Sequence, residues 1–203
     1  MYTYKKDSHT PVCPPDEAGR ILAVTNRSLC IRPFPEQLKR VCSISPKAII
    51  LREKDLSEAD YLTLAENCLT ICRSYNVPLI LHTHVRAART LGCSAIHLPL
   101  PVLEGSQDKL DGFTDIGVSI HSVEDARRAE ALGATYLTAG HIYSTDCKKG
   151  LPPRGLDFLQ EVCRSVSIPV YAIGGIQIGT GQIRQVMECG AAGGCIMSGM
   201  MQL

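Results

Sequence analysis

A stretch that could carry chemistry covers residues 140–150, where His141 is followed by hydroxyl side chains and then by Lys148 and Lys149. It follows residues 134–139, an apolar run typical of a short buried strand. An imidazole can move protons near neutral pH, and lysines together with backbone N–H groups can hold a phosphate. The pattern indicates a site for an anionic small molecule. A surface loop with a histidine of no special function and two solvated lysines would show the same sequence pattern.

The composition is that of a globular protein with little net charge. The chain has 203 residues, enough for one domain with a substantial core, and its formal net charge of +1 gives no sign of a nucleic-acid or membrane partner. No apolar run approaches the roughly 18 residues of a membrane span, and the polar residues 1–8 are not followed by the core of a signal peptide. The ten cysteines are scattered without a CxxC pair, which predicts reduced thiols in a cytoplasmic protein. Cys68 and Cys72 are expected to pack in the core rather than bind a metal.

Eight short apolar runs, most of them separated by helical patterns, predict repeated β–α units. Their spacing of about 20 to 35 residues suits a parallel sheet. The pattern predicts a compact (β/α)8 TIM barrel over residues 19–203 with an unusually short final helix, preceded by a flexible extension over residues 1–18. An open doubly wound sheet is the alternative. The strands are expected at 21–25, 47–52, 77–81, 94–98, 115–120, 134–139, 168–173 and 193–197, and helices at 57–75, 85–91, 122–133, 155–166 and 181–189.

In such a barrel the functional side chains follow the carboxyl ends of the strands. The loops after the seventh and eighth strands form the recurrent phosphate site of this fold, and glycines there let an anion approach the backbone N–H groups. Chemistry-bearing residues do fall at these positions: Arg52 and Lys54, Ser119, His141, Gly174 and Gly175, and Ser198.

Four separated motifs resemble the thiamin phosphate synthase superfamily. They lie at residues 51–56, 117–122, 145–148 and 172–176, in the order of that family, and the match runs from about residue 20 to the end of the chain. The resemblance implies a TIM barrel that binds a phosphorylated thiazole, with the phosphate held by the loops after strands seven and eight.

The superfamily has a synthase branch and a tautomerase branch. The synthase uses an Asn-Asp pair after strand three and an Asp after strand four, which hold magnesium for a pyrimidine pyrophosphate. Here His82 and Thr83 stand at the first position, and residues 97–102 offer no carboxylate, although magnesium prefers carboxylate oxygens. Residues 140–150 instead resemble the thiazole tautomerase branch, called TenI, whose catalytic histidine maps onto His141.

This resemblance implies an isomerase that needs neither a metal nor a cofactor. It would aromatise a tautomer of 2-carboxy-4-methylthiazole ethyl phosphate, with His141 as the proton carrier. The other residues are expected to bind the substrate: Arg52, Lys54 and Ser119 at the carboxylate or ring, Thr145 and Lys148 in the thiazole-site loop, and Gly174, Gly175, Met197 and Ser198 at the phosphate.

Three other functions remain open. One is a true thiamin phosphate synthase, one is a non-catalytic regulatory barrel that binds a thiazole phosphate, and one is an isomerase of a different phosphorylated metabolite. His82, His84 and His97 stand near strand ends without an evident carboxylate partner, and His121 is expected to cap a helix or to pack. Small barrels of this kind often self-associate, so a homodimer is expected.

Overall fold

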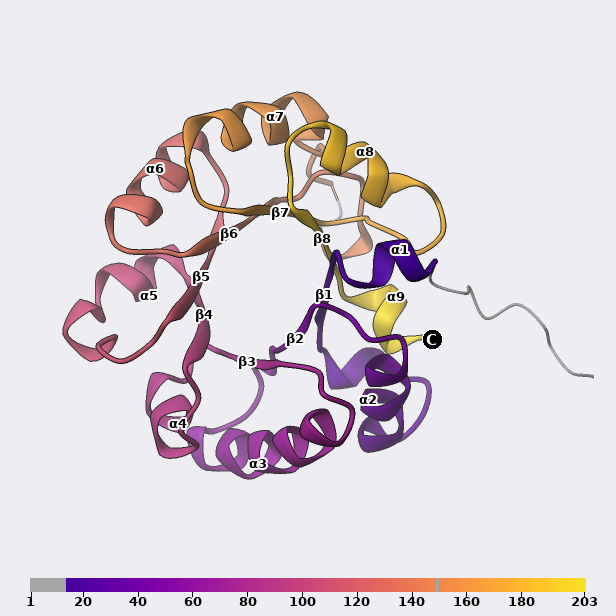
Figure 1. Ribbon diagram of the computed structural model, residues 1–203, viewed down its shortest axis with the longest axis vertical. Coiled ribbons are helices and arrows are strands. Elements are labelled where there is room, and N and C mark those ends of the chain that lie inside the picture. Colours follow the sequence, from indigo (N-terminus) through magenta and orange to yellow (C-terminus); the bar gives the residue numbers. More distant parts are fainter. Residues whose placement is uncertain (1–13, 149) are drawn as a thin grey trace, which may run out of the picture.

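The computed structural model describes residues 14–148 and 150–203. Eight parallel strands form a closed barrel in chain order, and the first strand completes the ring by pairing with the last. The helices surround this ring (Figure 1). The predicted TIM barrel is confirmed. An open sheet would have two strands with an unpaired edge, whereas here the first and last strands pair with each other, so the open sheet is excluded. The strands are β1 (Ile21–Val24), β2 (Ala48–Leu51), β3 (Leu79–His82), β4 (Ala95–Pro99), β5 (Asp115–Ile120), β6 (Tyr136–Gly140), β7 (Val170–Ile173) and β8 (Gly193–Ile196).

The five predicted helices are present with small shifts at their ends. Ser57 caps the first of them, because its Oγ accepts a hydrogen bond of 3.2 Å from the N–H of Asp60. Ser122 caps a later one in the same way, with a 3.0 Å hydrogen bond from the N–H of Asp125. These helices are α3 (Glu58–Ser74), α4 (Val85–Thr90), α6 (Val123–Ala131), α7 (Gly155–Ser165) and α8 (Gln182–Glu188).

Several elements were not predicted from the sequence. One of them, the short helix α1, falls within the expected extension over residues 1–18, and its last residue, Ala18, is buried. The earlier part of that extension, residues 1–13, lies outside the described residues. The unpredicted helices are α1 (Pro15–Ala18), α2 (Phe34–Ser43) and α5 (Leu100–Glu104), with the 3-10 turns η1 (Arg27–Leu29), η2 (Gln107–Lys109) and η3 (Asp146–Lys148).

The core has two layers because successive side chains of a strand point to opposite faces. In β1, Ile21 and Ala23 pack outward with the surrounding helices, while Leu22 and Val24 belong to a separate cluster inside the barrel. The same alternation along the other strands brings polar residues to the inside near their carboxyl ends. The outer layer includes Cys68 and Cys72, which confirms their expected packing in the core.

The last helix, α9 (Ser198–Met201), is as short as the sequence predicted. It is held to α2 by Gln37, whose side-chain amide donates a 2.6 Å hydrogen bond to the carbonyl oxygen of Met200. Met200 and Met201 are both fully buried. A single helical turn therefore covers the end of β8.

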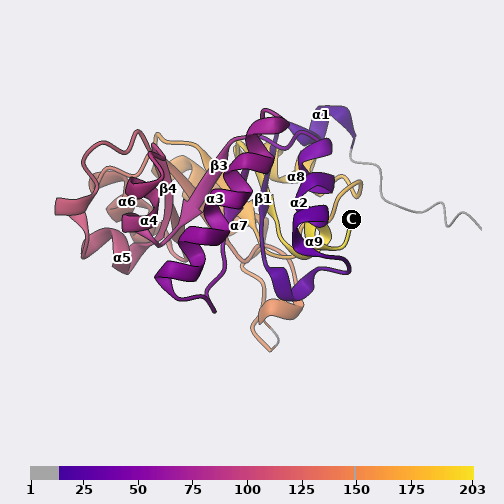
Figure 2. The same ribbon diagram turned by 90° about the horizontal axis from the view of Figure 1, so that it is seen from below.

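The loops after the strands gather on one side of the barrel. Figure 2 shows the loop that carries η3 projecting on the same side as the loop that carries η1. Within the described part of the chain, none of the helices has the length and apolar character needed to cross a membrane.

Candidate active site

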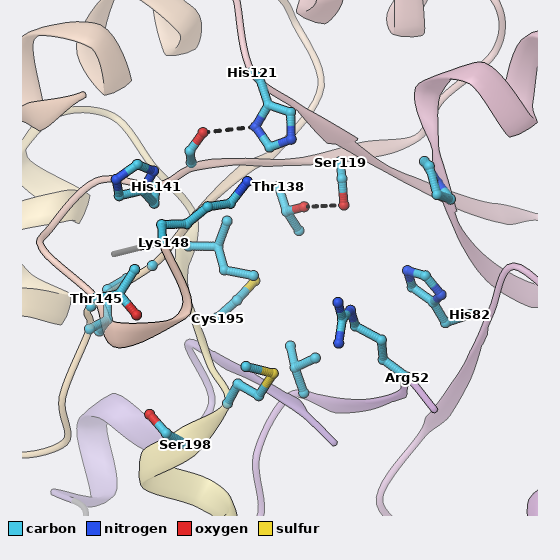
Figure 3. A pocket seen from close by; sticks show the side chains of 18 of the residues that line it. Arg52, His82, Ser119, His121, Thr138, His141, Thr145, Lys148, Cys195 and Ser198 are labelled. Carbon is cyan, nitrogen blue, oxygen red and sulfur yellow. Dashed lines mark hydrogen bonds between the residues drawn. The ribbon is translucent and has the colours of Figure 1, made fainter. Parts of the chain in front are cut away.

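A pocket of about 300 Å³ lies at the carboxyl end of the barrel (Figure 3). All ten residues predicted for the site contribute to its lining, and they come from the ends of five strands and their following loops. The structure thus brings the predicted residues together, while their individual roles remain predictions. These residues are His141, Arg52, Lys54, Ser119, Thr145, Lys148, Gly174, Gly175, Met197 and Ser198.

Two of the pocket's cations follow β2. Arg52 and Lys54 both line the pocket, whereas Glu53 between them does not. No ion pair joins Arg52 or Lys54 to a carboxylate within residues 14–148 and 150–203. The two side chains are therefore available for an anionic ligand.

Glu53 is used to fix the loop that carries these cations. It is 4% exposed and accepts a 2.6 Å hydrogen bond from the Thr25 hydroxyl, as well as bonds of 3.1 and 3.2 Å from the N–H of Arg27. The Arg27 guanidinium adds an ion pair at 3.2 Å. Thr25 in turn accepts a 2.9 Å hydrogen bond from the N–H of Arg52. This network satisfies the buried carboxylate and directs it away from the pocket.

A third cation, Lys148, reaches into the pocket from the loop after β6 (Figure 3). The pKa of Lys54 lies below its usual value, first because of the positive charge of Arg52, then because of partial burial and the charge of Lys148. The three cations repel one another, and a bound anion would relieve that repulsion. Lys149, the neighbour predicted to assist, lies outside the described residues.

This repulsion predicts a pH dependence of anion binding. The lowered pKa means that Lys54 loses its proton at a lower pH than an ordinary lysine, so the affinity for inorganic pyrophosphate should fall as the pH rises through that pKa. In the Lys54→Arg variant the charge persists, and the alkaline fall should shrink. Calorimetric titrations of both proteins across the alkaline range would measure this, since the titration of pyrophosphate itself is common to both. Identical pH profiles would contradict the prediction.

Gly174 and Gly175 follow β7 and shape another side of the pocket, away from Arg52 and Lys54. Their φ angles are +98° and +73°, and an added Cβ would lie 2.3 Å from the Cβ of His141 and 2.4 Å from the carbonyl oxygen of Ser144, respectively. Both glycines are needed where this loop packs against the loop after β6. In the described part of the chain their N–H groups donate no backbone hydrogen bond, so they are available for an anion.

Met197 and Ser198 complete this side after β8. The N–H of Ser198 also donates no backbone hydrogen bond within the described residues, and its hydroxyl borders the pocket (Figure 3). Backbone and hydroxyl donors from two adjacent loops therefore meet here, as the sequence predicted for a phosphate site.

His141 lies in the pocket beside the loop that carries Gly174 and Gly175, which we call the glycine loop. His121 lines the same pocket (Figure 3). The Nε2 atom of His141 is 3.4 Å from the carbonyl oxygen of Leu151, a long contact. Nδ1 of His121 forms a 2.9 Å hydrogen bond with the carbonyl oxygen of Gly140. Since that carbonyl can only accept, His121 carries its proton on Nδ1 when neutral and presents Nε2 as an acceptor.

His82 is a more central part of the site than the sequence suggested. It is 6% exposed, and its Nδ1 forms a 2.7 Å hydrogen bond with the hydroxyl of Thr83, a residue with a φ of +68°. Burial, followed by the neighbouring His97 and Arg52, lowers the pKa of His82 to about 3. A neutral imidazole therefore lines the pocket where the synthase resemblance implies an Asn-Asp pair.

Seven further lining residues were missed by the sequence reasoning. Most lie inside strands at inward-facing positions, where an apolar or small residue is indistinguishable from ordinary core. Two-residue periodicity counted back from Gly175 and Met197 would have indicated Ile173 and Cys195. They are Val24, Pro99, Thr138, Gly140, Ile173, Ile176 and Cys195.

The charged side chains that line the pocket are all positive. Three lining residues carry a positive charge, and none of the lining residues is an aspartate or glutamate. In the described part of the chain there is also no group of three or more His, Cys, Asp or Glu side chains arranged to hold a metal ion. The pocket suits phosphorylated or carboxylated ligands and disfavours a free cation.

Comparisons with known proteins identify the family of this chain and agree with its fold. The family model described as thiamine monophosphate synthase matches residues 21–200. The chain is 32% identical to the thiamine-phosphate synthase of Syntrophomonas wolfei, covering 88% of this chain and 86% of that one. It is also 32% identical to thiamine-phosphate synthase 2 of Streptococcus pneumoniae, over 92% and 89%. The solved thiamine phosphate pyrophosphorylase of Pyrococcus furiosus superposes with a TM-score of 0.76 at 26% identity, over 91% and 88%.

Proposed function

This chain belongs to the thiamine monophosphate synthase family, and we propose that it is a transferase of thiamin biosynthesis that couples a pyrimidine diphosphate to a thiazole phosphate. The observation that supports this proposal is that one pocket holds two regions of potential anion-binding groups, the cations that follow β2 and β6 and the backbone donors that follow β7 and β8. A reaction between two phosphorylated substrates would use both regions.

The isomerase class predicted from the sequence is wrong. The Syntrophomonas and Streptococcus relatives are named thiamine-phosphate synthases, and a synthase of this kind is a transferase. The prediction rested on the missing carboxylates after strands three and four and on the resemblance of the loop that carries His141 to the tautomerase branch. These two local features do not outweigh relatives that match most of the chain and are named as synthases.

The two regions stand on different strands of the barrel. Arg52 and Lys54 follow β2, while the glycine loop and Ser198 follow β7 and β8, with β1 between the two groups. Figure 3 shows Arg52 on one side of the pocket, Ser198 on another, and Lys148 on a third, next to His141. We assign the diphosphate to the cations, where their charge offsets that of the leaving group. We assign the thiazole phosphate to the glycine loop and Ser198.

Magnesium, which the synthase resemblance implies, does not fit the residues present. Magnesium prefers oxygen ligands, and the pocket offers imidazoles and cations without a carboxylate. In our proposal the charge of the diphosphate is therefore offset by Arg52, Lys54 and Lys148 alone. His141 takes the role of a side chain that contacts the thiazole, in place of the withdrawn role of proton carrier.

The same lack of carboxylates favours a second candidate, a non-catalytic barrel that binds a thiazole phosphate. Such a protein would keep the glycine loop and Ser198 as its binding site. It would have no use for a region that binds a diphosphate. With both substrates present, the transferase would form thiamin phosphate, whereas the non-catalytic protein would only bind thiazole phosphate.

The test is to incubate the purified protein with pyrimidine diphosphate and thiazole phosphate and to follow thiamin phosphate and released pyrophosphate. We expect product in the presence of a chelator at a rate close to that with added magnesium, because the residues that line the pocket include no carboxylate to hold the metal. Product formed only with magnesium would contradict the metal-free assignment. Tight binding of thiazole phosphate without any product would favour the non-catalytic candidate.

A further inference from the structure

A chain of hydrogen bonds runs through the inside of the barrel to the floor of the pocket. The Tyr136 hydroxyl lies 3.1 Å from Nδ1 of His97, and Nε2 of His97 lies 2.8 Å from the Ser119 hydroxyl. The Thr138 hydroxyl lies 3.2 Å from the same Ser119 oxygen. Ser119 and Thr138 line the pocket, whereas Tyr136 lines a separate cavity at the other end of the barrel. The chain thus connects the pocket with the interior below it.

The packing of the barrel makes room for this chain at Gly117. A Cβ atom at Gly117 would lie 2.0 Å from the Tyr136 ring and 2.5 Å from Nδ1 of His97. The missing side chain is therefore what allows the phenol and the imidazole to meet. His97 is 3% exposed and Tyr136 is 8% exposed, so water has little access to either.

The direction of the hydrogen bonds follows from the donors available. Burial lowers the pKa of His97 to about 3 and raises the pKa of Tyr136 well above its usual value, so the imidazole is neutral and the phenol keeps its proton. In the described residues the Tyr136 hydroxyl has no acceptor other than Nδ1 of His97. A buried donor without an acceptor is costly, so Tyr136 donates to Nδ1 and His97 carries its hydrogen on Nε2.

This direction determines what Ser119 can do. Its oxygen accepts from the Nε2–H of His97 and from the Thr138 hydroxyl (Figure 3), which uses both of its lone pairs. Its own hydrogen then has no acceptor within the described part of the chain. We infer that Tyr136 and His97 are positioning residues, which orient the Ser119 hydroxyl so that it donates its hydrogen to the bound ligand.

The tautomer of His97 can be measured in the free protein. Nitrogen NMR of ring-labelled histidine, with the His97→Gln variant for assignment, should show the hydrogen of His97 on Nε2. In the Tyr136→Phe variant, which lacks the donor to Nδ1, the spectrum should show a mixture of tautomers. A hydrogen on Nδ1 in the unaltered protein would overturn the inference. This measurement needs no ligand, so it remains informative if the proposed function fails.

A second measurement rests on the proposed function, since it uses thiazole phosphate and inorganic pyrophosphate as ligands. Loss of one oriented hydrogen bond should weaken the binding of at least one of them by about threefold to tenfold in Tyr136→Phe. Tyr171→Phe is the matched control, because the Tyr171 ring packs edge-on against Tyr136 at 6.0 Å and its hydroxyl has no hydrogen bond within the described residues.

The decisive comparison uses a background that lacks the serine hydroxyl. If Tyr136 acts through Ser119, then Ser119→Ala/Tyr136→Phe should bind no more weakly than Ser119→Ala alone. A purely structural effect of the tyrosine would weaken binding by the same factor in both backgrounds. In His97→Gln, the side-chain amide can replace the Nε2–H donor, so binding should be better than in His97→Leu. Equal effects of Tyr136→Phe in the two backgrounds would overturn the inference.

Discussion

Replacing Arg52 with alanine should weaken the binding of inorganic pyrophosphate by about 10-fold to 100-fold, because a hydrogen bond to a charged group contributes about 1.5–3 kcal/mol. Arg52 lines the pocket and has no carboxylate partner within the described residues, so its charge is not already satisfied by the protein. The backbone N–H of residue 52 keeps its hydrogen bond to Thr25 in the variant. The change therefore removes the ligand contact without removing the anchor of the loop.

The matched control is Arg164→Ala, which removes the same charge from an exposed position on α7. It should leave pyrophosphate binding almost unchanged, because charges on the surface are screened by solvent and salt. Isothermal titration calorimetry at one salt concentration measures both variants. Equal losses in the two proteins would mean that the pocket responds to overall charge, and the diphosphate assignment to Arg52 would be withdrawn.

Replacing Gly175 with alanine should abolish the binding of thiazole phosphate and destabilise the protein. The φ of Gly175 is +73°, and an added Cβ would lie 2.4 Å from the carbonyl oxygen of Ser144 and 2.7 Å from the Cβ of Tyr143. Backbone strain of this kind costs about 1–3 kcal/mol, and the clash must displace the loop after β6 as well. That loop carries other residues of the pocket, so binding should be lost beyond what the stability change explains.

Gly179→Ala separates the two contributions, since Gly179 lies in the loop between β7 and α8. Its φ is +72°, almost the same as that of Gly175, but an added Cβ would meet nothing within 4 Å. Gly179→Ala should lose stability through the same backbone strain as Gly175→Ala, but it should still bind thiazole phosphate. Urea unfolding and thiazole phosphate titrations would measure the two effects. Similar binding in both variants would contradict the account of the glycine loop.

The strands of the barrel were predictable because each is a short apolar run that forms both layers of the core. The two larger unpredicted helices, α2 and α5, have a common cause. Pro33 and Pro35 flank the start of α2, and Pro99 and Pro101 flank the start of α5. Proline is tolerated in the first turn of a helix, where its missing N–H would have no partner. A proline-rich start gives no apolar periodicity of its own, so neither helix was predicted from the sequence.

The positions of the candidate site were more predictable than its chemistry. The barrel fold brings the carboxyl ends of all strands to one face, so residues far apart in the sequence, such as Arg52 and Ser198, reach one pocket. The roles of His82 and His97 depend on burial and on neighbours from other strands, which no local pattern reports. The reaction class was predicted wrongly because the prediction relied on missing carboxylates and on one loop, whereas relatives that match most of the chain are named as synthases.

The proposed function requires one pocket that binds two anionic groups at the same time. It is tested most directly by titrating thiazole phosphate into protein that has been saturated with inorganic pyrophosphate. We expect the dissociation constant to change by no more than about tenfold and then to stay constant as more pyrophosphate is added, because two separate sites would show only modest coupling. A dissociation constant that keeps rising in proportion to the pyrophosphate concentration would show that both anions compete for one site, and would contradict the proposed transferase.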